Sequence, residues 1–286
     1  MMFNAGLVLE GGGMRGAYTA GVLDFFLDHG IDFKEVYGVS AGACQGANYI
    51  AKQKGRAFDV IYRYVDDERY MSFKNLIKTG FLFDYDFTMR EIPDRLIPFD
   101  YKTADENPSR FYAVVTEMTS GKAEALRLRN FKKDMDYVWA SSCLPLISKL
   151  CKINGKEYLD GGIANSIPLN MSRKNGNKFN VVILTRDPEY KKTPNRLMPL
   201  IAFKYRRYPA FVRAMARRHV MYNRTLEYIQ KGVKAGKVFV IQPKTPVDVG
   251  RLEKDPKKLK KLYEQGYEDA RASADKLMTF LNKCGN

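Results

Sequence analysis

The strongest constraint on the fold lies in the first 55 residues, where two short apolar segments are each followed by glycine and then by a helix-like segment. Residues 5–10 and 35–39 have the continuous apolar character of buried strands, whereas 16–29 and 42–54 have the length and pattern of helices. Strands that alternate with helices form parallel sheets covered by helices. The sequence therefore predicts an α/β fold, a three-layer α/β/α sandwich with a mainly parallel central sheet.

The rest of the chain shows no internal repeat, low-complexity tract or linker, so we expect a single domain over residues 1–286. Asn154-Gly155 is a strong hairpin signal, and Pro199 and Pro209 divide a basic helical segment at about 190–231 into at least two pieces. Residues 79–107 are rich in Pro, Asp and Phe and are expected to form an irregular insertion or lid. The other expected elements are hairpins at 110–128 and 149–159, strands at 179–185 and 238–242, and a charged helix at 256–282.

The composition is that of a protein with a real hydrophobic core, because 45% of the residues are hydrophobic. No apolar run approaches the roughly 20 residues that span a bilayer, and the N-terminus lacks the pattern of a signal peptide. These features predict a cytoplasmic protein. Because the cytoplasm is reducing, we expect the four scattered cysteines to be free thiols and Cys44 to be a small packing residue.

The charge is unusual, at +16 overall, and it is concentrated. Residues 190–226 contain no Asp or Glu, and a patch of one sign attracts nucleic acid or anionic lipid headgroups. A solvated helix face without a partner is the alternative. The ten basic residues of this tract are Lys191, Lys192, Arg196, Lys204, Arg206, Arg207, Arg213, Arg217, Arg218 and Arg224.

The glycine-rich segment 11–16, GGGMRG, has the spacing of two nucleotide-binding loops but lacks the partners that each requires. A P-loop needs Lys-Ser/Thr where this chain has Ala17-Tyr18. A dinucleotide site needs an acid at the carboxyl end of the second strand, whereas Asp32 and Glu35 precede or begin that strand. Phosphate and dinucleotide binding are therefore both disfavoured.

The carboxyl end of the second strand instead carries Gly38-Val39-Ser40-Ala41-Gly42. The pattern G-x-S-x-G between a strand and a helix is a nucleophile elbow, in which a strained turn presents the serine hydroxyl above the sheet. We predict that Ser40 is a nucleophile, with a tight structural turn as the alternative. The preceding glycine loop would then supply backbone N–H groups to the oxyanion of an acyl-transfer reaction.

A serine nucleophile needs a base, and the chain has only two histidines. His29 falls at the end of the first helix, away from the glycine loop, and His219 lies among cationic neighbours. A Ser–Asp–His triad through His219 stays open. A carboxylate is favoured because Asp160 ends a hairpin strand and is followed by two glycines, and Asp187 is the reserve candidate.

The three blocks GGGMRG (11–16), GVSAG (38–42) and DGG (160–162), in this order, resemble the patatin-like phospholipase family. The resemblance covers about residues 5–170 and is to a short bacterial member. It implies a patatin-like fold and a lipid acyl hydrolase of the phospholipase A or lysophospholipase type that uses no metal or other cofactor. It also implies a Ser40–Asp160 dyad and an oxyanion hole formed by the amides of Gly11, Gly12 and Gly13. The residues that support these motifs are Arg15, Gly16, Gly38, Ala41, Gly42, Gly161 and Gly162.

The expected partner is a phospholipid or another acyl-ester substrate, and no specific nucleic acid is predicted. The basic segment 190–226, with apolar residues among its charges, is expected to contact anionic membrane, which would place the protein at the inner membrane face. General carboxylesterase or thioesterase activity is an alternative. A basic protein that binds membranes or nucleic acid on a hydrolase scaffold is another.

Overall fold

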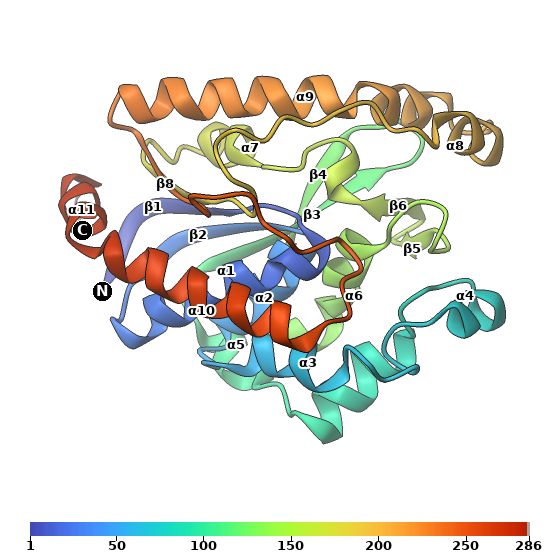
Figure 1. The fold of residues 1–286 in the computed structure, drawn as a ribbon, viewed down its shortest axis with the longest axis horizontal. Helices are drawn as coiled ribbons and strands as arrows, with labels where there is room; N and C mark the ends of the chain where they lie inside the picture. Colours follow the sequence, from blue (N-terminus) through green and yellow to red (C-terminus); the bar gives the residue numbers. More distant parts are fainter. Residues whose placement is uncertain (285–286) are drawn as a thin grey trace.

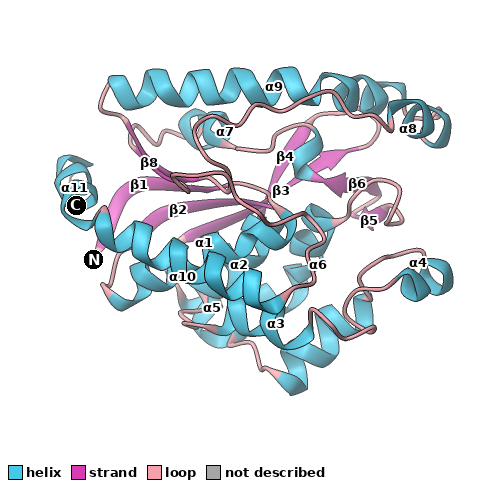
Figure 2. Ribbon diagram, viewed as in Figure 1, coloured by secondary structure: helices cyan, strands magenta, loops and turns pink. Residues whose placement is uncertain are grey.

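The computed structural model describes residues 1–284, and within them eight strands form one sheet (Figure 2). The order is β5-β6-β3-β2-β1-β7-β8, with β4 paired to β3. The parallel part of the sheet consists of β1 (Met2–Leu9), β2 (Asp32–Val39), β3 (Arg110–Glu117), β7 (Asn180–Ile183) and β8 (Val238–Ile241). The mainly parallel sheet predicted from the first 55 residues is confirmed.

Two antiparallel hairpins complete the sheet where they were expected. β4 (Ala123–Leu128) pairs with β3, and β5 (Cys151–Ile153) pairs with β6 (Lys156–Asp160). The turn between β5 and β6 has φ values of 49° at Asn154 and 78° at Gly155, as a tight hairpin turn requires. The last residue of β6 is Asp160, which pairs with Val115 of the neighbouring strand β3.

Helices cover both faces of the sheet (Figure 1). One face carries α1 (Gly16–Asp28), α2 (Ala41–Ile50), α3 (Arg56–Tyr64) and α10 (Pro256–Ala272). The other face carries α7 (Leu169–Lys174) and the long α9 (Pro209–Lys234), which α8 (Met198–Lys204) precedes. The three-layer α/β/α architecture is therefore confirmed.

Three predictions about local structure were wrong or incomplete. Residues 79–107 are largely helical. They include the π-helix η2 (Phe87–Leu96), which buries Phe87 and Ile92 in a cluster with Tyr70 and Leu82. The segment also contains the end of α4 (Phe73–Thr79) and all of α5 (Tyr101–Glu106). Tertiary packing of its aromatic residues outweighed the turn-forming composition.

The C-terminal segment 256–282, expected as one helix, is broken at Ser273 into α10 and α11 (Ala274–Leu281). The break lets Phe280 pack edge-on against Phe179, just before β7. Helix α6 (Phe131–Ser142) had no counterpart in the sequence prediction. It carries Ser141, which contacts the turn at Ser40, as described below.

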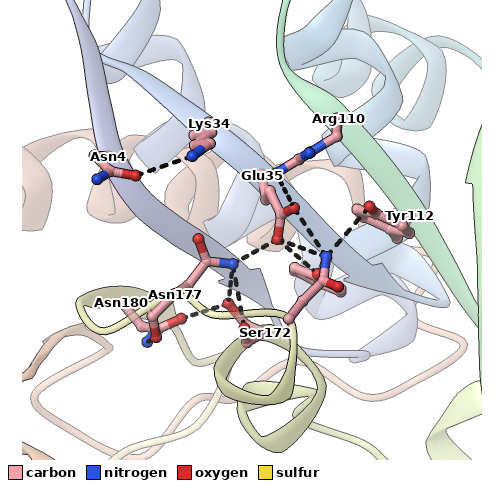
Figure 3. A network of polar contacts seen from close by, with 10 residues as sticks. Asn4, Lys34, Glu35, Arg110, Tyr112, Ser172, Asn177 and Asn180 are labelled. Atoms are coloured by element: carbon pink, nitrogen blue, oxygen red, sulfur yellow. Dashed lines mark hydrogen bonds and ion pairs between the residues drawn. The ribbon is translucent and has the colours of Figure 1, made fainter. Parts of the chain in front are cut away.

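A buried carboxylate joins β2 to the segment between α7 and β7 (Figure 3). Glu35 is fully buried and forms an ion pair with Arg110, with a distance of 2.5 Å between Oε1 and Nη2. It also accepts hydrogen bonds from the side-chain amides of Asn175 (2.9 Å) and Asn177 (2.5 Å) and from the Tyr37 hydroxyl (2.7 Å). This carboxylate, expected neither as a ligand nor as a base, therefore has a structural partner for each of its oxygens.

Candidate active site

The sheet register brings the glycine loop and the serine turn together. Leu9 at the end of β1 pairs with Gly38 at the end of β2, so the two following loops leave the sheet side by side. A Cβ atom placed on Gly11 would lie 3.2 Å from the Ser40 Cβ. The sequence prediction that both motifs share one edge of the sheet is therefore met by the geometry.

Ser40 occupies a strained turn between β2 and α2, with φ of 54° and ψ of −123°. Such a conformation costs a non-glycine residue about 1–3 kcal/mol and persists only where its surroundings hold it. Here the Ser40 amide donates to the Ser141 Oγ (2.8 Å), which itself donates to the carbonyl of Val114 (2.6 Å). Helix α6 and strand β3 thus clamp the turn from the side opposite the glycine loop.

The glycines of the pattern around Ser40 are required by close backbone approach. A Cβ on Gly38 would lie 2.5 Å from the carbonyl oxygen of Gly42, and one on Gly42 would lie 2.6 Å from that of Leu9. No side chain fits at such distances. The spacing G-x-S-x-G is therefore explained by the crossing of strand and helix.

Asp160 lies on the far side of β3 from β2, at the level of the serine turn. Val39 pairs with Val114, and the next residue of β3, Val115, pairs with Asp160. Asp160 is 3% exposed, and the Ser40 side chain lies close enough to its carboxylate to lower the pKa of Asp160. Its Oδ1 also accepts the Gly162 amide (2.6 Å).

Burial raises the pKa of Asp160 above its ordinary value of 3.8, because an ionised carboxylate loses hydration there. The neighbouring Ser40 side chain opposes this rise in pKa, as do the positive charge of Arg218 and the Gly162 amide. Arg218, on α9, donates its Nε–H to the Gly162 carbonyl and so lies next to the carboxylate. A carboxylate with a raised pKa is a better proton acceptor than an exposed one.

The glycine loop uses only part of its amide hydrogens. Gly11 donates to the Ser166 carbonyl (3.3 Å), and Met14 donates to the Arg251 carbonyl (3.1 Å). The amides of Gly12 and Gly13 donate no hydrogen bond to an acceptor within residues 1–284. Of the three glycines predicted for an oxyanion hole, Gly11 is thus already engaged.

The alternative bases lie elsewhere. His29 ends α1, stacks on Phe25 and contacts its carbonyl through Nδ1 (2.8 Å). Asp187 closes a turn by accepting the Glu189 amide (3.1 Å). His219 is on α9, but its neighbour Arg218 is the residue that reaches the turn after Asp160.

An apolar cavity of about 170 Å³ opens beside Ser40. Its walls come from α3, η2 and α6, so the segment predicted as a lid does line it. Cys44 is part of this wall, and burial raises the pKa of its thiol, in keeping with the packing role predicted for it. Lining residues that the sequence reading did not single out include Ile61, Phe83, Met89, Val138 and Trp139.

Two further properties concern the described part of the chain. Over residues 1–284, no three side chains of the His, Cys, Asp and Glu types gather as a metal site requires. In the same range, no helix combines the length and the apolar character needed to cross a membrane.

Comparison with known proteins agrees with this architecture. The family described as patatin-like phospholipase matches residues 7–172, and a domain of unknown function, DUF6363, matches residues 208–282. The Escherichia coli (strain K12) protein YjjU, itself uncharacterized, is 32% identical over 66% of this chain and 54% of its own length. Mouse patatin-like phospholipase domain-containing protein 7 is 28% identical over 62% of this chain and 13% of its own. The crystal structure of VipD from Legionella pneumophila aligns with a TM-score of 0.47 at 12% identity, over 98% of this chain and 67% of that one.

The mainly parallel sheet, the strained serine turn and the matched segment define a class of α/β protein with lipid-hydrolase relatives. The chain belongs to the patatin-like phospholipase family. Membership supports lipid hydrolase activity in general. This chain spans about half the length of the E. coli relative and a smaller part of the mouse protein.

Proposed function

We propose that this protein is a serine acyl hydrolase of the phospholipase A or lysophospholipase type, with Ser40 as nucleophile and Asp160 as base. The observation that carries the proposal is the placement of the buried Asp160 carboxylate next to Ser40 by the β2–β3–β6 register, at a turn whose strain is held by Ser141. The relatives that bear the name patatin-like phospholipase support the substrate class.

In this proposal the Ser40 hydroxyl transfers its proton to Asp160 as its oxygen attacks the ester carbonyl. The oxyanion that forms is stabilised by the amides of Gly12 and Gly13, each donor contributing roughly 3–4 kcal/mol in such sites. Asp160 returns the proton to the leaving alcohol, and an acyl group remains on Ser40. A water molecule activated by the same carboxylate then releases the fatty acid.

The cavity beside Ser40 is suited to an acyl chain, because aromatic and aliphatic side chains from α3, η2 and α6 line it. Apolar burial of a chain contributes about 0.8 kcal/mol per methylene. The polar residues of the lining include Ser40 and Arg251, and the lining also reaches Gly13 of the glycine loop. An ester would therefore enter with its chain inside and its head at the basic rim.

The expected experiment uses a fluorophosphonate probe, which labels activated serines. We expect labelling of the wild-type protein and release of fatty acid from phosphatidylcholine and lysophosphatidylcholine. Ser40→Ala should remove both signals, whereas Ser109→Ala, at a buried serine just before the start of β3, serves as the control and should keep the label. Labelling without release from any phospholipid, but with turnover of p-nitrophenyl or thioester substrates, would favour the general esterase or thioesterase alternative.

The basic segment 190–226 supports peripheral contact with anionic membrane, which we include in the proposal. Eight of its ten basic residues are exposed. On and just before α8, Leu197, Leu200 and Phe203 are 54%, 52% and 70% exposed, beside Arg206 and Arg207. Apolar side chains of this kind insert into the interface while cations contact headgroups.

We expect the protein to co-sediment with phosphatidylglycerol-rich vesicles and to be released by salt, at about 1 kcal/mol per basic residue near the surface. Phe203→Asp should weaken this binding, and Tyr62→Asp, an exposed aromatic residue outside the segment, is the matched control. Sedimentation that is indifferent to anionic lipid and to salt would contradict the proposal.

A further inference from the structure

Two residues of the basic tract differ from the other eight, because Lys192 and Arg218 are partly buried. They lie with three more cations near the glycine loop, at the carboxyl ends of β1, β7 and β8. In open parallel sheets this edge is where ligands bind. The five residues, called the basic cluster below, are Arg15 of η1 (Gly13–Arg15), Arg186 and Lys192 after β7, Arg218 of α9, and Arg251 after β8.

Contacts place members of the basic cluster next to the glycine loop and the serine site. The Lys192 ammonium lies 4.3 Å from the centre of the Tyr222 ring, and the Tyr222 hydroxyl donates to Glu10 (2.7 Å), which precedes the glycine loop. Arg218 bonds the Gly162 carbonyl, two residues from Asp160. The positive cluster is therefore adjacent to the proposed dyad.

Arg251 joins the basic cluster to the acyl cavity. Its carbonyl holds the Met14 amide, and the residue lines the cavity at Ser40. Its charge also acts on Asp160, Lys192 and Arg15. A group bound by these cations would consequently lie within reach of an ester placed at Ser40.

The five cations of the basic cluster outnumber the carboxylates that act on them, which within residues 1–284 include Glu10 and Asp160. Arg15 is only 5% exposed, yet within residues 1–284 its Nε and Nη1 have no hydrogen-bond partner, and neither does the buried Nε of Arg186. The nearby Glu10 already accepts from the Thr185 amide, the Thr185 hydroxyl and Tyr222. Buried cations with free donors are costly unless an anion is bound.

The proton affinity of Lys192 reflects the same imbalance. Burial, followed by the charges of Arg218 and Arg251, lowers its pKa to about 7. Arg15 lowers it further, whereas Glu10 opposes the shift. An arriving anion would reverse the effect of these cations, so its binding should be accompanied by proton uptake.

We propose that the basic cluster is a binding site for a phosphate group, placed so that the phosphate of a lipid headgroup is held while its ester lies at Ser40. The proposal rests on the proposed function for the lipid as the source, whereas the anion site itself does not. Guanidinium groups bind phosphate oxygens through charge-assisted hydrogen bonds, and among the described residues Arg15 has free donors for such bonds at Nε and Nη1.

The binding test uses Ser40→Ala, which cannot turn over substrate, and inorganic phosphate as the probe in isothermal titration calorimetry at pH 8. We expect binding at about 1 mM or tighter, with proton uptake seen as a dependence of the heat on buffer ionisation. Adding Lys192→Met or Arg251→Met should weaken binding at least about tenfold. Lys191→Met, at the exposed neighbour, should leave it unchanged. No phosphate binding, or equal binding by all variants, would overturn the site.

The source of the phosphate is tested by comparing lysophosphatidic acid with a monoacylglycerol of the same chain. We expect Arg251→Met to lower kcat/KM at least about tenfold for the phosphate-bearing lipid and less than about threefold for the neutral one. If Arg251→Met lowers kcat/KM equally for both lipids while calorimetry shows phosphate binding at the basic cluster, the site is supported with free phosphate as its ligand. Phosphate binding without hydrolysis of either lipid would contradict the proposed function and leave the anion site supported.

Discussion

Replacing Ser40 by alanine, or Asp160 by asparagine, is expected to lower kcat/KM for p-nitrophenyl butyrate at least about 10³-fold. The first change removes the nucleophile. The second leaves a side chain of the same shape that accepts no proton, because an amide is not a base. Each variant should retain the wild-type far-UV circular dichroism and melting behaviour within a few degrees, so the loss reports chemistry rather than unfolding.

His219→Ala is the matched control for this prediction, since His219 is the remaining candidate for a triad. It should keep kcat/KM within about threefold of the wild type. A large loss in His219→Ala together with an active Asp160→Asn would replace the dyad with a histidine-dependent mechanism.

The pH profile of the wild-type enzyme separates a base from a residue that only positions the serine. The base must be ionised, and burial raises the pKa of Asp160, so activity should fall on the acid side with a midpoint above 3.8. Arg218 lowers that pKa through its charge. Arg218→Met should therefore move the acid midpoint upward on the neutral ester, and an unmoved midpoint would contradict the assignment of the acid limb to Asp160.

Glu35→Gln is expected to lower the free energy of unfolding by about 3–5 kcal/mol, the cost of breaking a buried ion pair from one side. The change leaves Arg110 without its counter-charge and turns an amide N–H₂ group toward donors that include the amides of Asn175 and Asn177. Urea denaturation with an unchanged m-value would measure the loss as stability rather than as altered compactness.

The control for Glu35 is Glu264→Gln, which removes an exposed carboxylate 3.8 Å from Lys260 on α10. Surface pairs of this kind contribute about 0–1 kcal/mol. Similar decreases in the free energy of unfolding of Glu35→Gln and Glu264→Gln would contradict the prediction. They would show that burial and the three neutral donors do not make Glu35 more stabilising than a surface carboxylate.

Much of the scaffold was predictable because it depends on local patterns. The apolar segments before the glycine loop and before Ser40 specify buried strands, and the alternation with helices specifies a parallel sheet. Asn154-Gly155 specifies the β5–β6 hairpin through the positive φ angles that these residues adopt. The nucleophile candidate, the glycine loop and Asp160 could be named for the same reason, because each lies in a short motif.

Other parts of the site depend on contacts between distant segments, which no local pattern reports. Ser141 is 101 residues from Ser40 along the chain, and nothing around it marks the clamp on the serine amide. The engagement of the Gly11 amide by Ser166 follows from how the loop after Asp160 folds back. The helical structure of residues 87–96 follows from where Phe87 and Ile92 are buried.

The sequence by itself thus determined the class of fold and the position of the serine turn, since strand and turn preferences are local, and it predicted Asp160 as the carboxylate near that turn. Only the tertiary structure decided which basic residues of the 190–226 tract face solvent and which lie near the glycine loop. The physical reason is that burial and charge spacing arise from packing: Lys192 and Arg218 are like their neighbours in sequence, and differ from them only through what surrounds their side chains.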